Sequence, residues 1–199
     1  MNSDITSKLK KIGIFTGEDT AREGRCRVMK YVGQGTKFGH IDEDGNITTP
    51  IVYDYVEPFF NGMAVVKKDD KFGYVNLSGK LVIPPIYDSA RSFSSDRAGV
   101  TINDKAGHID IAGNVITPFI YDDTSHFYKS RAKVFLNGKI GYVNLDGELV
   151  IPTIFDDGEN FSNANIISVR IKKHKLNINK DGYPSSLKER SILFNTMFK

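Results

Sequence analysis

Short runs of β-branched and aromatic residues, separated by turn residues, recur along most of the chain. Residues 71–83, KFGYVNLSGKLVI, contain one such run, then Leu-Ser-Gly, then a second run. This pattern favours two strands joined by a hairpin. The run RAGVTI at residues 97–102 predicts a third strand, and the Asn-Asp pair after it is typical of a tight turn. One unit is therefore predicted to be an antiparallel meander of about three strands.

The segment between the second and third strands carries its own signals. Pro84 cannot donate a backbone hydrogen bond, so we expect the strand ladder to stop there. Asp88 is able to cap the amides of a single helical turn, and we expect Tyr87 and Phe93 to pack inward.

The same arrangement returns every 34 residues, and residues 71–88 match residues 139–156 at 13 of 18 positions. Five sets of residues keep the period: Gly39, Gly73, Gly107 and Gly141; Gly45, Gly79, Gly113 and Gly147; Pro50, Pro84, Pro118 and Pro152; Asp54, Asp88, Asp122 and Asp156; Phe59, Phe93, Phe127 and Phe161. Such a period indicates a repeat architecture, in which each unit buries its apolar face mainly against its neighbours.

We expect a single, mainly β repeat domain arranged as an open, solenoid-like or curved array, with short helices capping its ends. Its predicted parts are an N-terminal cap with a degenerate repeat (1–36), four repeats (37–70, 71–104, 105–138 and 139–173), and a degenerate repeat with a C-terminal helix (174–199). The first and third repeats share His-Ile-Asp, whereas the second and fourth share Tyr-Val-Asn. This alternation indicates duplication of a two-repeat cassette.

The two ends show helical patterns. Ile5, Leu9 and Ile12 have helical spacing behind the candidate caps Ser3 and Asp4, although KIGIF at residues 11–15 is also compatible with a worn repeat start. Ser186 and Glu189 form a capping-box pattern ahead of an apolar-rich segment. We expect this helix to close the array, with partner docking as the alternative. Cys26 occupies the place of Ala64 and Ala98, which predicts a small buried residue rather than a reactive thiol.

The charge is unevenly distributed along the chain. The formal net charge is +3, but residues 39–168 contain 18 acidic and 11 basic side chains, and the remaining residues carry a net charge of +10. An acidic repeat body attracts cationic proteins and repels nucleic acid. The basic run RIKKHK at residues 170–175 is the best place for a phosphate contact, but Arg170, Lys172 and His174 are more typical of the wet face of an edge strand.

These spaced landmarks resemble the bacterial WG-repeat family over roughly residues 20–182. Units of that family read Trp-Gly-Tyr-Ile-Asp, a glycine turn, Ile-Pro-Pro-x-Tyr-Asp, a phenylalanine and an Ala-Val strand. The family's tryptophan is replaced here by Phe38, Phe72, Ala106 and Ile140. The resemblance implies β-rich repeats used in binding, with no common catalytic activity, and small cytoplasmic members of such families sometimes resemble neutralisers of toxins.

Enzymatic chemistry has weak support. His40 with Asp42, and His108 with Asp110, could share one face of a strand, but no nucleophile motif such as GxSxG accompanies them. The four histidines are spread along the repeats, and neither GxxxxGK[ST] nor GxGxxG occurs, so we expect no metal, phosphate loop or other cofactor. The single cysteine cannot form an intramolecular disulfide, and the absence of a secretory leader or an apolar run of about 18 residues favours the cytoplasm.

We therefore expect a non-enzymatic, cytoplasmic binding scaffold that recognises a basic protein partner, such as a toxin or effector that it neutralises. A carbohydrate-binding or small-ligand module is the main alternative, and an enzyme using the His-x-Asp pairs is a second. Aromatic and acidic residues that vary between repeats are the candidates for partner contact, because the repeated landmarks serve folding. They are Tyr55, Glu57, Asp69, Asp70, Asp96, His126, Tyr128, Asp157 and Glu159.

Overall fold

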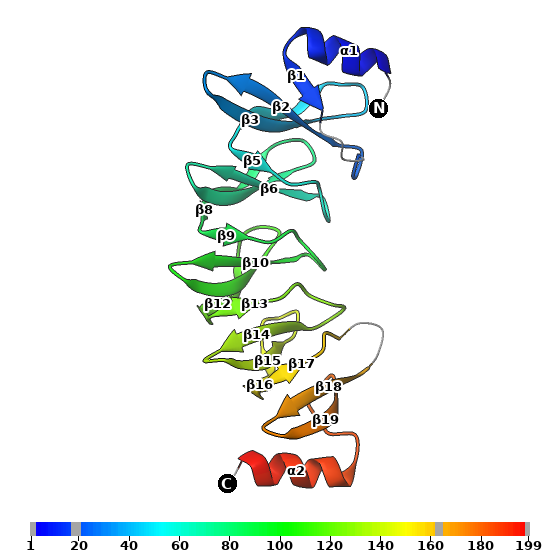
Figure 1. The fold of residues 1–199 in the computed structure, drawn as a ribbon, viewed down its shortest axis with the longest axis vertical. Helices are drawn as coiled ribbons and strands as arrows, with labels where there is room; N and C mark the ends of the chain where they lie inside the picture. Colours follow the sequence, from blue (N-terminus) through cyan, green and yellow to red (C-terminus); the bar gives the residue numbers. More distant parts are fainter. Residues whose placement is uncertain (1–2, 17–20, 162–164, 198–199) are drawn as a thin grey trace. The chain divides into compact units, whose positions relative to one another are not determined.

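The computed structural model describes residues 3–16, 21–161 and 165–197. Within these residues the chain forms five small antiparallel sheets and two short helices (Figure 1). None of the sheets closes on itself, so each ends at two edge strands. The prediction of tandem antiparallel meanders with a helix near each end is confirmed.

The strands of each sheet follow one another in the chain. The first sheet contains β1 (Ile14–Thr16), β2 (Cys26–Val32), β3 (Gly35–Ile41) and β4 (Ile47–Tyr53). The second contains β5 (Tyr55–Val56), β6 (Met63–Lys68), β7 (Lys71–Asn76) and β8 (Leu81–Tyr87). The third contains β9 (Ser89–Ala90), β10 (Arg97–Ile102), β11 (Lys105–Asp110) and β12 (Val115–Tyr121). The fourth contains β13 (Asp123–Thr124), β14 (Ala132–Leu136), β15 (Lys139–Val143) and β16 (Leu149–Phe155). The fifth contains β17 (Asp157–Gly158), β18 (Ile166–Ile171) and β19 (His174–Asn179).

The chain divides into two compact units, residues 1–93 with 111–113 and residues 94–110 with 114–199. The first unit holds strands β1 to β9 and the helix α1 (Ser3–Lys11). The second unit holds strands β10 to β19 and the helix α2 (Leu187–Met197).

The tight turns between the second and third strands of the sheets are as predicted, and each sheet of repeats combines the end of one predicted repeat with the start of the next. Ile102 pairs with Lys105, so Asn103 and Asp104 form a two-residue loop in which both φ angles are positive, at 50° and 59°. Asparagine, aspartate and glycine tolerate this conformation best, and it matches the right-handed twist of the strands.

The aspartate that follows each proline-containing strand does not cap a helical turn, so that prediction is wrong. A two-residue strand, such as β9 after Asp88, occupies this place and opens the next sheet. Asp122 shows what the aspartate does: one oxygen lies 2.8 Å from Lys105 Nζ and the other accepts the backbone N–H of Asn137 at 2.7 Å. The lysine and this N–H hold the pKa of the exposed Asp122 below its ordinary value. The aspartate thus joins its own sheet to the tight turn of the next one.

The prediction that proline stops the ladder is also wrong. Pro84 lies inside β8, and Tyr87 beyond it still pairs with Phe72. The strand tolerates proline because it is an edge strand, where the missing N–H removes no ladder bond. Tyr87 and Phe93 are 4% and 2% exposed, which confirms that both pack inward.

The first glycine of each repeat is required by close packing between strands. A Cβ atom at Gly141 would lie 2.6 Å from the carbonyl oxygen of Ile151 on the neighbouring β16. No side chain fits there without moving a strand backbone. Gly39, Gly73 and Gly107 face the same obstruction from their own fourth strands.

Replacing Gly141 by alanine should therefore destabilise the protein by about 3 kcal/mol or more, because β15 and β16 must separate. Gly138→Ala is a matched control: Gly138 has a φ of +71° but no atom within 4 Å of the added Cβ. It should cost only about 1 kcal/mol, the penalty for a left-handed alanine. Urea unfolding of both variants checks this, and equal losses would contradict it.

A buried polar ring on the third strand of each of the first four sheets alternates between histidine and tyrosine. His40 is fully buried, with Nδ1 3.0 Å from Thr49 Oγ1 and Nε2 2.9 Å from the carbonyl oxygen of Glu57. In the next repeat the Tyr74 hydroxyl donates to the carbonyl of Arg91 at 2.8 Å, and Ile83 replaces the threonine. A landmark phenylalanine packs against each ring, as Phe59 does on His40 at 4.7 Å between centroids.

These bonds explain the 68-residue alternation in the sequence. His108 with Thr117 repeats the His40 arrangement, and Tyr142 with Ile151 repeats that of Tyr74. A buried histidine has two ring nitrogens to satisfy, so the residue paired with it on the fourth strand must supply a hydroxyl. A buried tyrosine has only its hydroxyl to satisfy, so an apolar residue is sufficient at the paired position. The carbonyl of Glu57 can only accept, so Nε2 of His40 carries a proton. Burial lowers the pKa of His40 to about 4 and so keeps the ring neutral near pH 7, and Nδ1 then accepts from the Thr49 hydroxyl.

Burial is the main cause that lowers the pKa of His40 to about 4 from its ordinary value of 6.5. As the pH falls from 6.5 towards 4, the unfolded chain takes up a proton at this position that the folded chain does not. His40 should therefore reduce stability by about 3 kcal/mol over this window, with no further loss below it.

The double variant His40→Tyr with Thr49→Ile reproduces the pair found in the second and fourth repeats. The variant should fold. Its free energy of unfolding should decrease less than that of the wild type as the pH falls from 6.5 to 4, because His40 no longer contributes. Chemical unfolding of wild type and variant between pH 7 and pH 4 measures the difference. Parallel curves for the two proteins would contradict the assignment.

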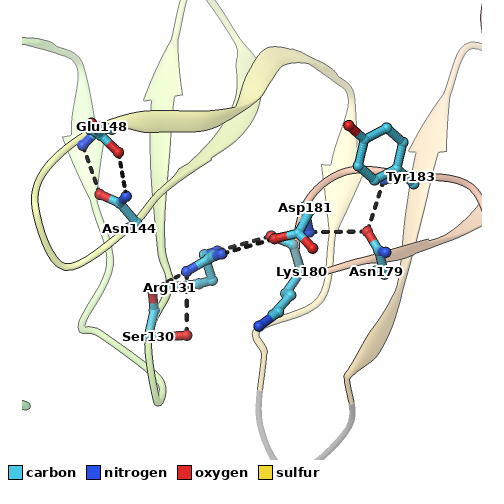
Figure 2. A network of polar contacts seen from close by, with 8 residues as sticks. All are labelled: Ser130, Arg131, Asn144, Glu148, Asn179, Lys180, Asp181 and Tyr183. Carbon is cyan, nitrogen blue, oxygen red and sulfur yellow. Dashed lines mark hydrogen bonds and ion pairs between the residues drawn. The ribbon is translucent and has the colours of Figure 1, made fainter.

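Arginine side chains also join successive sheets. Arg131 Nε donates to the carbonyl of Lys180 at 2.9 Å, and Arg131 Nη2 lies 3.4 Å from Asp181 Oδ1 (Figure 2). Lys180 and Asp181 belong to the glycine turn of the fifth sheet. Asn179 shapes that turn by accepting the backbone N–H groups of Asp181 and Tyr183. Arg25 and Arg97 make the same Nε bond to the carbonyls of Leu77 and Leu145, whereas Met63 occupies this place in the second sheet.

The N-terminal prediction is partly correct. Leu9 of α1 is buried, but the helix ends before Ile12, which is 61% exposed. Ile14 and Phe15 of the KIGIF segment, together with Thr16, then form β1, the outer strand of the first sheet. Cys26 is half-buried, so the predicted burial is incomplete compared with Ala64 and Ala98.

The capping box of the C-terminal helix is confirmed. Ser186 Oγ accepts the backbone N–H of Glu189 at 3.2 Å, and the Glu189 carboxylate accepts the N–H of Asn177 on β19 at 3.0 Å. Ser185 N–H donates to the carbonyl of Asn177, so residues 183–185 and α2 replace the missing fourth strand. The basic run 170–175 does not form one edge strand as predicted, because Lys172 lies in the turn between β18 and β19.

Candidate functional site

The His-x-Asp pairs are used by the fold. Both ring nitrogens of His40 are bonded, to Thr49 and to the backbone of Glu57, and the ring is fully buried. Asp42 accepts the backbone N–H groups of Asp44 and Asn46, so it shapes the glycine turn instead of orienting the imidazole. The pair therefore presents no free base to a substrate.

The described residues contain no group of three or more His, Cys, Asp or Glu side chains that could hold a metal ion. No helix among them is long and apolar enough to span a bilayer.

In the first unit, four of the predicted contact residues form two pairs. Tyr55 lies on β5, and Glu57 comes directly after this strand. The tyrosine is 39% exposed, and the Glu57 carboxylate lies 2.5 Å from the Ser92 hydroxyl. Asp69 and Asp70 form the exposed tight turn between β6 and β7, and Asp70 pairs with Lys67 at 2.8 Å. Glu57 thus has a structural bond, whereas the Asp69 side chain is exposed to solvent.

In the second unit, the predicted residues divide between loops and a groove. Asp96 is exposed in the loop before β10, and Tyr128 is 41% exposed in the loop before β14, with half-buried His126 close by in the chain. The two loops are neighbours, because the Ser94 hydroxyl donates to the carbonyl of Phe127 at 2.9 Å.

Asp157 and Glu159 lie together in a groove of about 250 Å³ on the fifth sheet. Gly158, Ser168, Val169, Arg170 and Lys175 complete its lining. Asp157 faces Arg170 across β17 and β18, and Arg170 faces Lys175 across β18 and β19. One carboxylate oxygen of Glu159 accepts the N–H of Ser168. The groove therefore presents acidic and basic groups side by side.

Most basic residues of the repeats have structural partners. Lysines pair with the repeated aspartates in all four repeats, and Arg97 and Arg131 bind backbone carbonyls. By contrast, some exposed carboxylates have no bond or ion pair with any other described residue. They are Glu43, Asp44 and Asp69 in the first unit, and Asp96, Asp104 and Asp146 in the second. These six carboxylates are therefore available to a partner, on a repeat body whose residues 39–168 contain 18 acidic and 11 basic side chains.

One exposed set escaped the sequence analysis because its members repeat. Proline and the aliphatic residue two positions later point outward on the fourth strand of the repeats, as in Pro84 and Ile86. Val52, Ile86 and Ile120 are 47%, 46% and 50% exposed. The regular 34-residue spacing contains these positions, but such spacing is equally typical of residues that serve folding.

Comparisons with solved structures show the fold alone. The crystal structure of a eukaryotic initiation factor matches with a TM-score of 0.56 and 12% identity, covering 86% of this chain and 54% of that chain. The chain thus spans about half the length of that protein. Two weaker matches are a symmetrical protein described in a study of de novo evolutionary emergence (TM-score 0.30, 9% identity, 88% and 91% covered) and a 2S albumin seed protein from Dolichos (TM-score 0.27, 10% identity, 80% and 87% covered).

A search of curated proteins finds no match. The profile of the WG containing repeat, however, matches four times in succession, at residues 38–72, 72–105, 107–139 and 140–173. These matches cover more than half of the chain and coincide with the repeated glycine, proline, aspartate and phenylalanine positions. The chain belongs to the WG containing repeat family.

Proposed function

We propose that this chain is a non-enzymatic scaffold that binds a basic protein partner in the cytoplasm. The observation that carries the proposal is the acidic charge at exposed turns and loops: six carboxylates there have no ion pair with a described residue, on a repeat body with 18 acidic and 11 basic side chains in residues 39–168. Exposed carboxylates on preformed turns attract cationic partners at long range and pair with them at little conformational cost.

The loop and groove residues of the second unit are the proposed contact points. Asp96 and Tyr128 lie on neighbouring loops, and an acidic and aromatic pair of this kind suits lysine and arginine side chains. In the first unit, Asp69 with Tyr55 offers the same two chemistries. Neutralisation of a toxin or effector is part of the proposal, since occupying a basic surface blocks whatever anionic substrate that surface binds.

The test begins with affinity capture under cross-linking, followed by binding measurements with the purified partner at several salt concentrations. Asp96→Asn and Asp69→Asn should each weaken binding about threefold to tenfold, mainly through the association rate, and high salt should reduce the difference. Ser7→Lys on α1 is the matched control, because it changes the net charge equally away from the proposed contacts.

Three results would contradict the proposal: a partner with an acidic surface, an affinity that does not change with salt, and an equal effect of Ser7→Lys and Asp96→Asn. The neutralising role is tested separately, by asking whether one equivalent of the chain abolishes the activity of the partner.

A further inference from the structure

Four charged side chains of opposite sign line the groove on the fifth sheet, which consists of β17, β18 and β19 (Figure 1). Asp157 lies directly opposite Arg170, and Arg170 lies directly opposite Lys175, so these three side chains point to the same face of the sheet. Glu159, two residues after Asp157, also lines the groove. A basic partner suits the two carboxylates but leaves Arg170 and Lys175 without a counterpart.

None of these four side chains forms an ion pair with another described residue. Opposite charges that face each other across strands normally stabilise a sheet by about 0.2–1 kcal/mol. Here one oxygen of Asp157 instead accepts the next backbone N–H at 2.8 Å, and one oxygen of Glu159 accepts a backbone N–H of β18 at 3.1 Å. The Arg170 and Lys175 head groups have no hydrogen bond to a described residue. The groove therefore keeps its acidic and basic groups apart and available.

The strand that carries the carboxylates is fixed by the sheet before it. A Cβ atom at Gly158 would lie 2.3 Å from the Tyr142 hydroxyl, so glycine lets β17 lie against this buried ring. The hydroxyl donates to the carbonyl of Glu159 at 2.8 Å, and Lys133 Nζ lies 3.3 Å from the carbonyl oxygen of Gly158. The acidic side of the groove is thus in place before a ligand arrives, which lowers the conformational cost of binding.

The same place in the fourth sheet is apolar. Phe135 and Ile140 pair there as Arg170 and Lys175 do in the fifth sheet, and Phe155 of the fourth strand pairs with Ile140 on its other side. The fifth sheet has three strands, and no described strand pairs with Lys175 on that side. Charged groups therefore occupy a position that is apolar and adjoined by an aromatic residue in the fourth sheet.

A ligand with a single kind of charge meets repulsion in this groove. The two carboxylates repel a phosphate or sulfate group, and the two cationic side chains repel a metal ion. A ligand with one ammonium and one carboxylate group satisfies both halves. Residues directly opposite each other have Cβ atoms about 4.5–5.5 Å apart, so the two charges of the ligand must also be close together. The volume of about 250 Å³ lies below the range of about 300–1,000 Å³ typical of pockets for drug-sized molecules, so the ligand is small.

We propose that this groove binds a free α-amino acid, with its ammonium group at Asp157 and Glu159 and its carboxylate at Arg170 and Lys175. The two charged groups of an α-amino acid are attached to one carbon atom, which matches the short distance between the opposing strands. Arginine can bind a carboxylate through two parallel N–H groups, so Arg170 is the main contact for that end of the ligand. This ligand is additional to the basic partner, and neither proposal depends on the other.

NMR titration of the full, ¹⁵N-labelled chain with each of the proteinogenic L-amino acids tests the proposal. At least one should shift the backbone signals of β17 and β18 saturably, with one molecule bound per chain and a Kd of about 1 mM or lower. The N-acetyl derivative of the strongest ligand lacks the ammonium group, and its amide lacks the carboxylate. Each should bind about tenfold more weakly, because one charge-assisted contact is lost. The absence of saturable shifts with every amino acid would overturn the proposal, as would derivatives that bind as well as the parent.

Variants assign the two ends of the ligand. Arg170→Gln should weaken binding of the amino acid about tenfold and leave binding of its amide unchanged, since the amide has no carboxylate to lose. Asp157→Asn should weaken binding of the amino acid in the same way and leave that of the N-acetyl derivative unchanged. Both side chains are exposed, so circular dichroism and thermal unfolding should show an intact fold.

Matched controls remove the same charges outside the groove. Lys173→Gln changes an exposed residue in the turn between β18 and β19, and Asp146→Asn changes an exposed residue in the glycine turn of the fourth sheet. Both should bind the amino acid as the wild type does, and controls that act like Arg170→Gln and Asp157→Asn would show that the groove is not the site. The measurements use this chain and free amino acids alone, so their failure leaves the test of the basic partner unaffected.

Discussion

A hydrogen bond from a buried ring to the first backbone segment of the next sheet connects the repeats. The acceptor carbonyl lies 17 residues after the donor in all four cases, whether the donor is histidine or tyrosine. Each sheet is too small to bury its own apolar face, so packing against a neighbour is necessary. The ring sets how the neighbours align, because a buried carbonyl left without a donor costs about 1–3 kcal/mol.

The other repeated residues support this connection. A glycine lets the fourth strand approach the third, a phenylalanine packs on the buried ring, and the aspartate reaches the next tight turn. Arginine adds a longer bond to the following glycine turn. Surface ion pairs such as Lys105–Asp122 add little stability individually, so their main effects are to orient the turn and to neutralise lysines.

Using lysine in this way shapes the surface available for binding. The unpaired carboxylates lie in turns and loops, where substitution costs little stability, and they differ between repeats. The fourth strands present a second kind of surface, apolar and regular.

The sequence by itself determined the period, the antiparallel meanders, the tight turns, the inward aromatic residues and the capped C-terminal helix. These features depend on local properties: glycine and asparagine at positive φ, strand-forming runs, and Ser186 with Glu189 three residues apart. Only the tertiary structure decided the roles of Pro84, Asp88 and His40, because each depends on a neighbouring strand or sheet. Proline is tolerated at an edge that tertiary pairing creates, and the partners of the aspartate and the histidine lie 9 to 17 residues away. Exposure of Val52, Ile86 and Ile120 was likewise decided in three dimensions, since regular spacing is the same for a buried side chain and for one that faces solvent.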